Sequence, residues 1–258
     1  MSETATPRWP IVLMYHAVGS RPRAVDVHNL FVPLERFVEQ LDAIAERGLR
    51  PVSLQELAAA AGGTGAGTCV LTFDDAYEST LEVAAPLLAE RGWPASVFVA
   101  SRTIGGYSEW NEHLREPLLD LDGLRELRRH GFSVGAHSRS HRDLRGLPAG
   151  ELEFETRGCF DDLADGLGVR PDWFAYPYGY HDAPARAAVA AAGCVGAFAV
   201  HHAHGRFAWP RVDVNATDNL RTFGLKLRPA YPTLRRALGV APSLRRLAHR
   251  VAGYASHH

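Results

Sequence analysis

Short apolar runs alternate with longer helical stretches along most of the chain, and this alternation limits the fold more than any other feature. Apolar runs separated by segments of helix length are typical of strand-helix-strand units built around a parallel sheet. Glycine directly follows several predicted helices, where it can adopt the left-handed conformation that ends a helix before the next strand. These glycines are Gly48, Gly92, Gly131 and Gly193. The repetition favours an α/β fold with a parallel barrel.

The predicted elements follow from these patterns. Strands are expected at residues 11–15, 70–73, 95–100, 132–136, 173–175, 196–200 and 211–214. Helices are expected at residues 34–46, 80–91, 122–130, 151–167 and 183–192.

Two groups of polar side chains directly follow predicted strands. Asp74 and Asp75 come at the end of one apolar run, and His137 follows another, with His141 four residues later. In strand-helix folds, catalytic groups collect at the carboxyl ends of strands, so these two strand ends could face one pocket. One carboxylate and two imidazoles can bind a divalent metal, with a second carboxylate beside them to handle a proton. The outline is that of a hydrolase site.

Each group also has a structural interpretation. An Asp-Asp pair after a strand can be a turn or a helix N-cap. Two histidines four residues apart can lie on a solvated helix face. Both groups follow strand-like runs of similar character, however, and together they favour the catalytic interpretation.

Composition indicates an ordinary globular chain. Its 258 residues are 46% hydrophobic, and the length suits one barrel-type domain as well as two small ones. The three cysteines lack metal-site spacing, and two of them, Cys69 and Cys194, lie in apolar runs, so no disulfide framework is implied. The first residues contain no basic segment followed by a long apolar stretch, and residues 11–15 are too few to cross a bilayer. We expect a cytoplasmic protein.

Charge is distributed unevenly. Residues 221–258 contain 8 basic and no acidic side chains, so residues 1–220 hold the remaining 20 basic and all 29 acidic ones. We predict a barrel domain at 1–220 and a basic amphipathic tail at 221–258. The tail could lie on an anionic membrane surface or dock on a partner, or it could pack on its own acidic domain. Nucleic acid is disfavoured because no basic and aromatic groove is visible elsewhere.

Two further motifs complete a family resemblance. The segments PYG at 177–179 and MYH at 14–16 also lie at the ends of predicted strands. With the Asp pair and the segment HSRSH, they resemble the NodB-homology polysaccharide deacetylases, carbohydrate esterase family 4, and most closely the branch that acts on poly-N-acetylglucosamine. The resemblance covers residues 11 to about 215. It implies a distorted (β/α)7-type barrel in a single domain and a bound divalent metal, most commonly Zn²⁺, although Co²⁺, Ni²⁺ and Fe²⁺ also suit these ligands.

The resemblance also implies roles for individual residues. It places Asp75, His137 and His141 on the metal and makes Asp74 the general base. The oxyanion that develops on an N-acetyl carbonyl needs a backbone donor in addition to the metal. The resemblance points to the amide N–H of Tyr178, whereas the ring of that tyrosine can be no more than a wall of the pocket.

A leaving amine must be protonated, so a general acid is required. Many family members supply it from a late Leu-x-His segment, which residues 11 to about 215, the part of the chain that the resemblance covers, do not contain. In the poly-N-acetylglucosamine branch the histidine comes early in the chain, and the resemblance therefore implies His16. The competing candidates are His201, His202 and His204, unless they form an exposed polar loop, and His16 could instead have a structural role.

The chain departs from the family pattern at two places. Members commonly have Gly after the Asp pair and Arg at the start of the PYG segment, where this sequence has Ala76 and Ala175. The missing arginine leaves Asp74 without an obvious partner. We expect Arg211, near the last predicted strand, to take its place, unless it is an ordinary surface arginine.

These expectations describe a metal-dependent enzyme that removes N-acetyl groups from amino sugars in a glycan or glycoconjugate. Without a recognisable export signal, a lipid-linked or nucleotide-linked sugar is a better substrate than secreted chitin or peptidoglycan. A basic tail would suit peripheral membrane contact. Two alternatives stay open: a hydrolase of non-sugar amides or cyclic imides on the same fold, and an inactive glycan-binding module.

Overall fold

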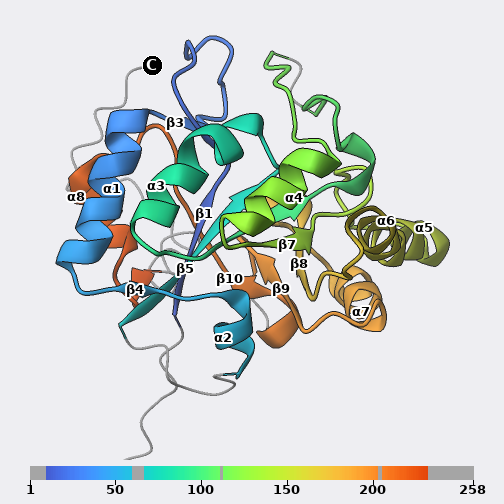
Figure 1. The fold of residues 1–258 in the computed structure, drawn as a ribbon. Coiled ribbons are helices and arrows are strands. Elements are labelled where there is room, and N and C mark those ends of the chain that lie inside the picture. The colour runs from blue at the N-terminus through green and yellow to red at the C-terminus, as the bar shows by residue number, and fades with distance from the viewer. Residues whose placement is uncertain (1–9, 60–66, 111–112, 203–204, 232–258) are drawn as a thin grey trace, which may run out of the picture.

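A curved, all-parallel sheet forms the centre of the molecule, and helices cover its outer face (Figure 1). The computed structural model describes residues 10–59, 67–110, 113–202 and 205–231. The strand order is β10-β9-β8-β7-β6-β5-β1-β11, with β4 also paired to β5. The strands are β1 (Ile11–Tyr15), β4 (Arg50–Pro51), β5 (Thr68–Asp74), β6 (Ala95–Val99), β7 (Phe132–Ala136), β8 (Trp173–Ala175), β9 (Gly196–Ala199), β10 (Trp209–Pro210) and β11 (Val212–Asp213). A separate pair joins β2 (Ala17–Val18) to β3 (Phe31–Val32).

The sheet almost closes into a barrel because one extended segment pairs at both of its edges. β10 pairs with β9, and β11, which is separated from β10 by one residue, pairs with β1. Arg211 is the residue between them, and its N–H donates to the carbonyl of Ala199 at 2.8 Å. The predicted α/β barrel is therefore confirmed.

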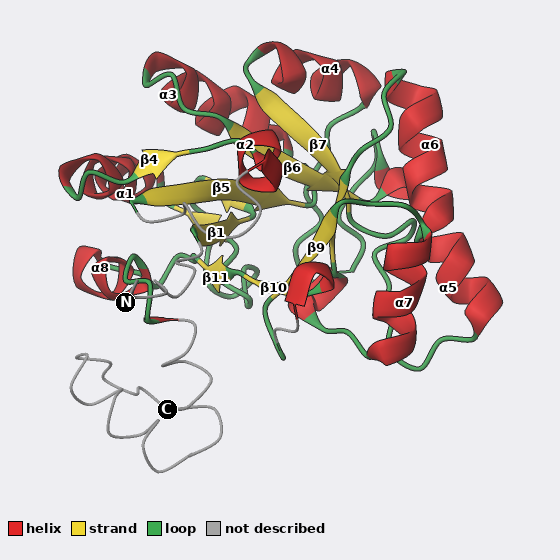
Figure 2. Cartoon of the chain, turned by 90° about the horizontal axis from the view of Figure 1, so that it is seen from below, coloured by secondary structure: helices red, strands yellow, loops and turns green. Residues whose placement is uncertain are grey.

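Most of the helices surround this barrel on its outside, whereas α2 lies over one end of it (Figure 2). The α-helices are α1 (Leu34–Glu46), α2 (Leu54–Ala59), α3 (Ala85–Glu90), α4 (Leu121–Arg129), α5 (Ala149–Glu155), α6 (Arg157–Leu167), α7 (Ala183–Ala191) and α8 (Leu220–Lys226). A π-helical turn, η1 (Thr80–Ala84), leads into α3, and short 3-10 turns lie at η2 (Ser101–Thr103), η3 (Pro177–Gly179) and η4 (Gly205–Phe207). None of the helices in the described ranges combines the length and apolar character needed to span a membrane.

One predicted helix is divided in two. Residues 151–167 were expected to be continuous, but α5 ends at Glu155 and α6 begins at Arg157. Thr156 lies at the break with φ −94° and ψ −74°. Its hydroxyl donates to the carbonyl of Leu152 at 2.7 Å, a back-bond that bends helices.

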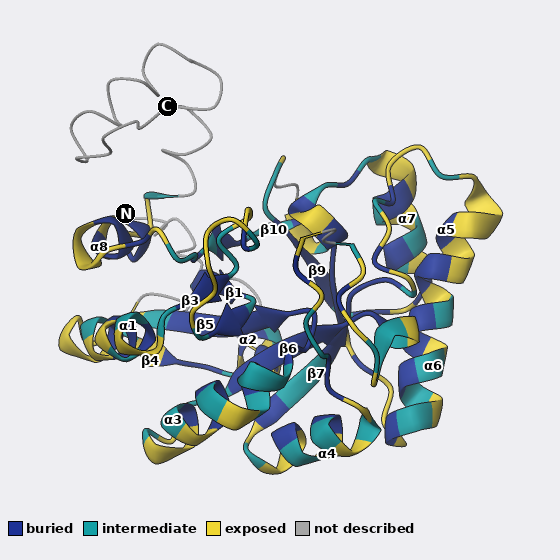
Figure 3. Ribbon diagram, turned by 90° about the horizontal axis from the view of Figure 1, so that it is seen from above, coloured by how far each residue is buried: buried dark blue, intermediate teal, exposed yellow. Residues whose placement is uncertain are grey.

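The core lies in two layers, one on each face of the sheet (Figure 3). All five residues of β1 and all five of β6 are buried, as expected for parallel strands covered on both sides. Inside the barrel, Val12, Val70 and Phe98 pack with Leu57 of α2. The interior is therefore filled by side chains and is not a pore. The three cysteines are buried and free, in agreement with the sequence.

The start of the predicted tail packs on the domain. Helix α8 contacts α1, where Arg47 donates to the carbonyl of Gly224 at 2.6 Å. Lys226 is buried and lies 2.6 Å from the carboxylate of Asp218. Residues 232–258, which carry most of the predicted amphipathic pattern, lie outside the described residues. The domain boundary after residue 220 stays a prediction.

Candidate active site

The polar motifs meet at the carboxyl ends of neighbouring strands. Asp74 ends β5 and His137 follows β7, and both strands pair in parallel with β6 between them. Asp75, His137 and His141 each offer a ligand atom, and these atoms lie within 4.8 Å of one another. The Nε2 atom of His141 lies 3.2 Å from Oδ1 of Asp75, and Nε2 of His137 lies 3.5 Å from the same oxygen. The structure thus brings the three predicted ligands together.

The hydrogen bonds of this cluster fit a divalent cation. Oδ1 of Asp75 is buried and accepts no hydrogen bond, although two imidazole nitrogens face it. The Nδ1 atom of His137 lies 2.8 Å from the carbonyl of Ala175, which only a protonated nitrogen can satisfy, so the lone pair is on Nε2. A buried carboxylate oxygen without a donor is costly unless a cation binds there. One oxygen and two imidazole nitrogens are a ligand set that Zn²⁺ and similar ions prefer.

The electrostatics of the cluster keep the ligands in their binding forms. Burial raises the pKa of Asp75, but the charge of His141 and further interactions with the histidines outweigh this effect and lower that pKa to about 2. Burial lowers the pKa of His137 to about 4, in spite of the charge on Asp74. Near neutral pH the carboxylate is therefore ionised and the His137 imidazole is neutral, which are the states that metal binding requires.

Asp74 adjoins this cluster, with Oδ2 3.9 Å from Nε2 of His137, but its carboxylate is paired with Arg211. The guanidinium donates to both carboxylate oxygens at 2.7 and 2.6 Å, and the arginine side chain is fully buried. Burial raises the pKa of Asp74, but the Arg211 charge is the largest of the influences that lower it, and the net shift is downward. Arg211 is therefore not a surface residue, and it pairs with Asp74, which Ala175 cannot do. Its role in turnover stays a prediction.

The backbone is unusual at this site. Seven non-glycine residues in the described segments have a positive φ, and five of them belong to the site motifs. The five are Asp75 (73°), Ala76 (62°), Ser138 (61°), His141 (57°) and Tyr178 (58°). Non-glycine residues adopt this conformation at a cost, and such residues cluster at functional sites. The positive φ of Ala76 explains why glycine suits the position after an Asp pair.

His16 lies at the same rim. It follows β1, whose last residue, Tyr15, is in register with Phe73 of β5, so His16 lies beside the end of β5. The charge of His16 lowers the pKa of both Asp74 and Asp75, although burial of those carboxylates acts in the opposite direction. The position suits a general acid, and that role stays a prediction.

The competing histidines follow β9 instead. The ring of His201 stacks on that of Tyr180, with centroids 4.2 Å apart. His202 acts electrostatically on His181, whose pKa is lowered first by burial and then by the charges of Arg186 and His202. His204 lies outside the described residues.

Two aromatic rings flank His141. The indole of Trp110 stacks on its imidazole with centroids 4.0 Å apart, and the ring of Tyr178 meets it edge-on at 4.9 Å. Tyr178 is 49% exposed, so its ring forms an open wall. Sequence patterns did not predict the contact of Trp110 with His141, because no local pattern reports a ring contact across 31 residues.

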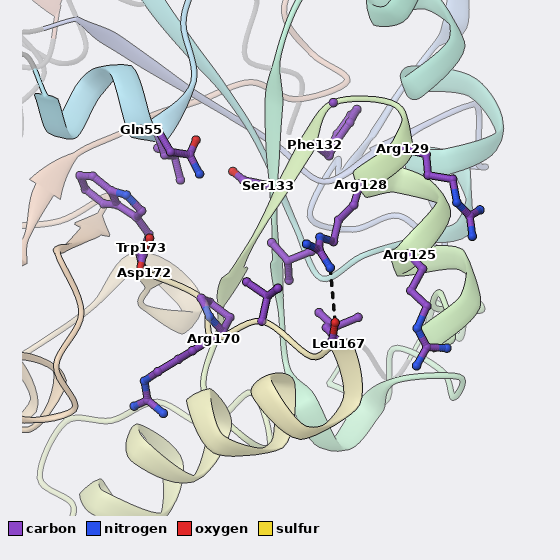
Figure 4. A pocket seen from close by; sticks show the side chains of 15 residues that line it. Gln55, Arg125, Arg128, Arg129, Phe132, Ser133, Leu167, Arg170, Asp172 and Trp173 are labelled. Atoms are coloured by element: carbon purple, nitrogen blue, oxygen red, sulfur yellow. Dashed lines mark hydrogen bonds between the residues drawn. The ribbon is translucent and has the colours of Figure 1, made fainter.

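A hollow of about 740 Å³ lies at the other end of the barrel (Figure 4). It is lined by the start of β7, the start of β8 and by four arginines, Arg125, Arg128, Arg129 and Arg170. Arg125 donates to the carbonyl of Gly166 at 2.7 Å, and Arg170 donates to that of Ala192 at 2.8 Å. These contacts satisfy the carbonyls at the ends of α6 and α7. Because the starts of the strands line the hollow, it is remote from the catalytic motifs, which follow the strand ends. The hydrogen bonds of Arg125 and Arg170 indicate a structural role for these arginines.

Comparisons with known proteins agree with the geometry. The family described as polysaccharide deacetylase matches residues 61–197. YxkH of Bacillus subtilis (strain 168), assigned to the polysaccharide deacetylases, is 27% identical over 167 residues, which are 62% of this chain and 54% of that protein. The chain thus spans about half the length of this curated relative.

Solved structures of deacetylases share the fold. The Streptococcus pyogenes deacetylase PplD, in complex with acetate, superposes with a TM-score of 0.75 at 21% identity, covering 87% of this chain and 100% of that one. IcaB from Ammonifex degensii gives a TM-score of 0.70 at 22% identity, covering 88% of this chain and 98% of that one. The family match covers more than half of the sequence. The chain therefore belongs to the polysaccharide deacetylase family, as its motifs predicted.

Proposed function

We propose that the protein is a metal-dependent hydrolase that removes the N-acetyl group from an amino sugar in a glycan or glycoconjugate. One observation carries this proposal: a buried Asp75 oxygen without a donor faces two imidazole nitrogens, while the neighbouring Asp74 is held separately by Arg211. Family membership supports the type of bond that is cleaved, and the acetate complex of PplD supports the acyl group.

The chain's own residues divide the chemistry among them. A divalent cation held by Asp75, His137 and His141 would supply Lewis acidity, which polarises a carbonyl and makes water more acidic. Asp74 accepts a proton from the attacking water, and its lowered pKa keeps it ionised and ready to do so. Arg211 fixes the orientation of that carboxylate through two hydrogen bonds.

Two further groups act on the acetyl oxygen and on the leaving nitrogen. The Tyr178 amide donates to the oxygen that becomes negative as water adds to the acetyl carbon. His16 donates a proton to the sugar nitrogen as the C–N bond breaks, so that the products are acetate and a free amine. The Trp110 ring covers one face of the His141 imidazole.

The substrate class and the location of the protein extend the proposal. A lipid-linked or nucleotide-linked sugar, or a short glycoside, in the cytoplasm fits the expectation from the sequence, and the basic tail would contact the membrane surface. Because residues 221–231 pack on the domain or adjoin it, deletion of residues 232–258 is the cleaner test of that contact. Retained binding to anionic vesicles after this deletion would contradict it.

An assay of acetate release tests the central proposal. Metal-loaded protein should release acetate from oligomers of N-acetylglucosamine, and a chelator should abolish the release. Ring opening of a cyclic imide without acetate release would favour the other type of amide hydrolase. Glycan binding without any turnover, under several metals, would favour a binding module.

A further inference from the structure

A buried carboxylate lies directly beneath the loop that carries the two histidines. Glu155, the last residue of α5, is only 1% exposed. Its Oε2 atom accepts the backbone N–H groups of Arg139 at 3.0 Å and of Ser140 at 2.9 Å. Its Oε1 atom accepts the Ser140 hydroxyl at 2.5 Å. Buried carboxylates require such donors, and here all three come from a single short loop.

The donors belong to the three residues that join His137 to His141. Two successive N–H groups of this loop converge on one carboxylate oxygen, which is the arrangement of a backbone anion nest. Ser138 and His141, on either side of these donors, have φ values of 61° and 57°. A loop with two such residues does not hold its shape through local preference, and contacts from outside the loop must stabilise it.

A second carboxylate holds the same loop by its side chain. Asp162 of α6 accepts two hydrogen bonds from the guanidinium of Arg139, at 2.7 and 2.5 Å. Gly158 makes room for this guanidinium, because a Cβ atom there would lie 2.8 Å from an Arg139 nitrogen. Both helices on either side of the break at Thr156 therefore bind the loop. Glu155 of α5 binds the backbone of the loop, and Asp162 of α6 binds the side chain of Arg139.

We infer that Glu155 is a positioning residue that sets the spacing of His137 and His141 around Asp75. The inference rests on the proposed metal site, since Glu155 acts through the loop that carries the two imidazoles and does not touch substrate. Partners of this kind, one step removed from a metal, typically affect metal affinity by about 10-fold to 100-fold.

Metal affinity of purified full-length variants tests this role. Zn²⁺ affinity is measured by competition with a chelator, and the visible spectrum of the Co²⁺ form reports the geometry of the ligands. Glu155→Ala should weaken Zn²⁺ binding by about 10-fold or more and alter the Co²⁺ spectrum. Glu155→Gln keeps an oxygen for the two backbone N–H groups, and it should stay within about threefold of the wild type.

Controls separate this effect from a general loss of stability. Glu153→Ala removes an exposed glutamate from the same helix, one that pairs only across the surface with Arg157, and it should leave Zn²⁺ affinity unchanged. If Glu155→Ala does not fold, Glu155→Asp takes its place. Its side chain is one methylene shorter than that of glutamate, and the same loss of Zn²⁺ affinity is expected. Wild-type affinity and an unchanged Co²⁺ spectrum in Glu155→Ala, or in Glu155→Asp where that variant takes its place, would overturn the inference. Failure of the wild-type chain to bind Zn²⁺ would instead overturn the proposed function.

Discussion

The guanidinium of Arg211 grips both carboxylate oxygens of Asp74, at 2.7 and 2.6 Å, across 137 residues of sequence. Arg211 reaches this position because it lies between β10 and β11, where the chain changes its pairing partner from β9 to β1. The bend that closes the barrel therefore also places the Arg211 guanidinium, which orients the carboxylate of Asp74, the proposed base.

Replacing Arg211 should damage both stability and turnover. Arg211→Ala leaves a buried carboxylate without its partner, which we expect to cost about 3–5 kcal/mol of unfolding free energy. It also removes the main influence that lowers the Asp74 pKa, so that pKa rises and the acidic limb of the kcat/KM profile moves to higher pH. Chemical denaturation and a pH-rate profile check the two effects.

The double variant Arg211→Ala with Asp74→Asn is the matched control for stability. It removes both charges, and it should therefore be more stable than Arg211→Ala alone. Unchanged turnover and an unchanged pH profile in Arg211→Ala would contradict the proposed role.

The metal-free protein should lose stability as the solution becomes mildly acidic. Burial lowers the pKa of His137 from its usual value to about 4. As the pH falls, the His137 imidazole is therefore protonated in the unfolded chain before it is protonated in the folded protein. Stability contributed by the neutral imidazole is thus present above about pH 6.5 and falls toward pH 4, by up to about 1.4 kcal/mol per pH unit. The pH dependence of the unfolding free energy, measured in the presence of a chelator for wild type and for His137→Gln, gives this contribution. Equal slopes for the two proteins between pH 6.5 and 4 would be evidence against this assignment.

His16 should be needed for turnover and not for metal binding. If His16 donates the proton to the leaving amine, His16→Ala should lower kcat by about 10²-fold to 10⁴-fold while Zn²⁺ affinity stays at the wild-type level. His201→Ala, which removes a ring stacked on Tyr180, is the comparison. A larger loss of kcat in His201→Ala than in His16→Ala would transfer the role to the histidines after β9.

The contribution of Tyr178 should come from its backbone. Tyr178→Phe keeps the amide and the ring, and it should keep kcat within about threefold of the wild type. Tyr178→Gly keeps the amide and suits the φ of 58°, so it should mainly raise KM through loss of the ring wall. Steady-state kinetics on one substrate separate these effects. A drop of about 100-fold in kcat for Tyr178→Phe would show that the hydroxyl is required.

Much of the barrel could be predicted because its elements have strong local patterns. The expected runs 11–15, 132–136 and 173–175 coincide with β1, β7 and β8, and the expected helix at 34–46 coincides with α1. The expected run 211–214 contains β11, whereas β2, β3, β4, β10 and α2 were missed, since segments this short have no measurable periodicity. The division at Thr156 was missed because it depends on one side-chain hydrogen bond.

The site was predictable to the extent that its residues follow strands. Asp74, Asp75 and His137 are placed by strand ends, which the apolar runs mark. The pairing of Arg211 with Asp74 depends on barrel closure, so the sequence supported it only as a hypothesis. Glu155 had one signal that was not used. It lies three residues after Leu152 and four before Cys159, both buried, so helical spacing places its charge on an apolar face.

The most direct test of the metal-dependent mechanism measures metal content and acetate release on the same preparations of wild type, Asp74→Asn and Asp75→Asn. We predict that wild type holds a divalent ion and releases acetate from N-acetylglucosamine oligomers, that Asp74→Asn keeps the ion and loses acetate release, and that Asp75→Asn loses both. Loss of the ion in Asp74→Asn, or acetate release by wild-type protein from which all metal has been removed, would contradict the account.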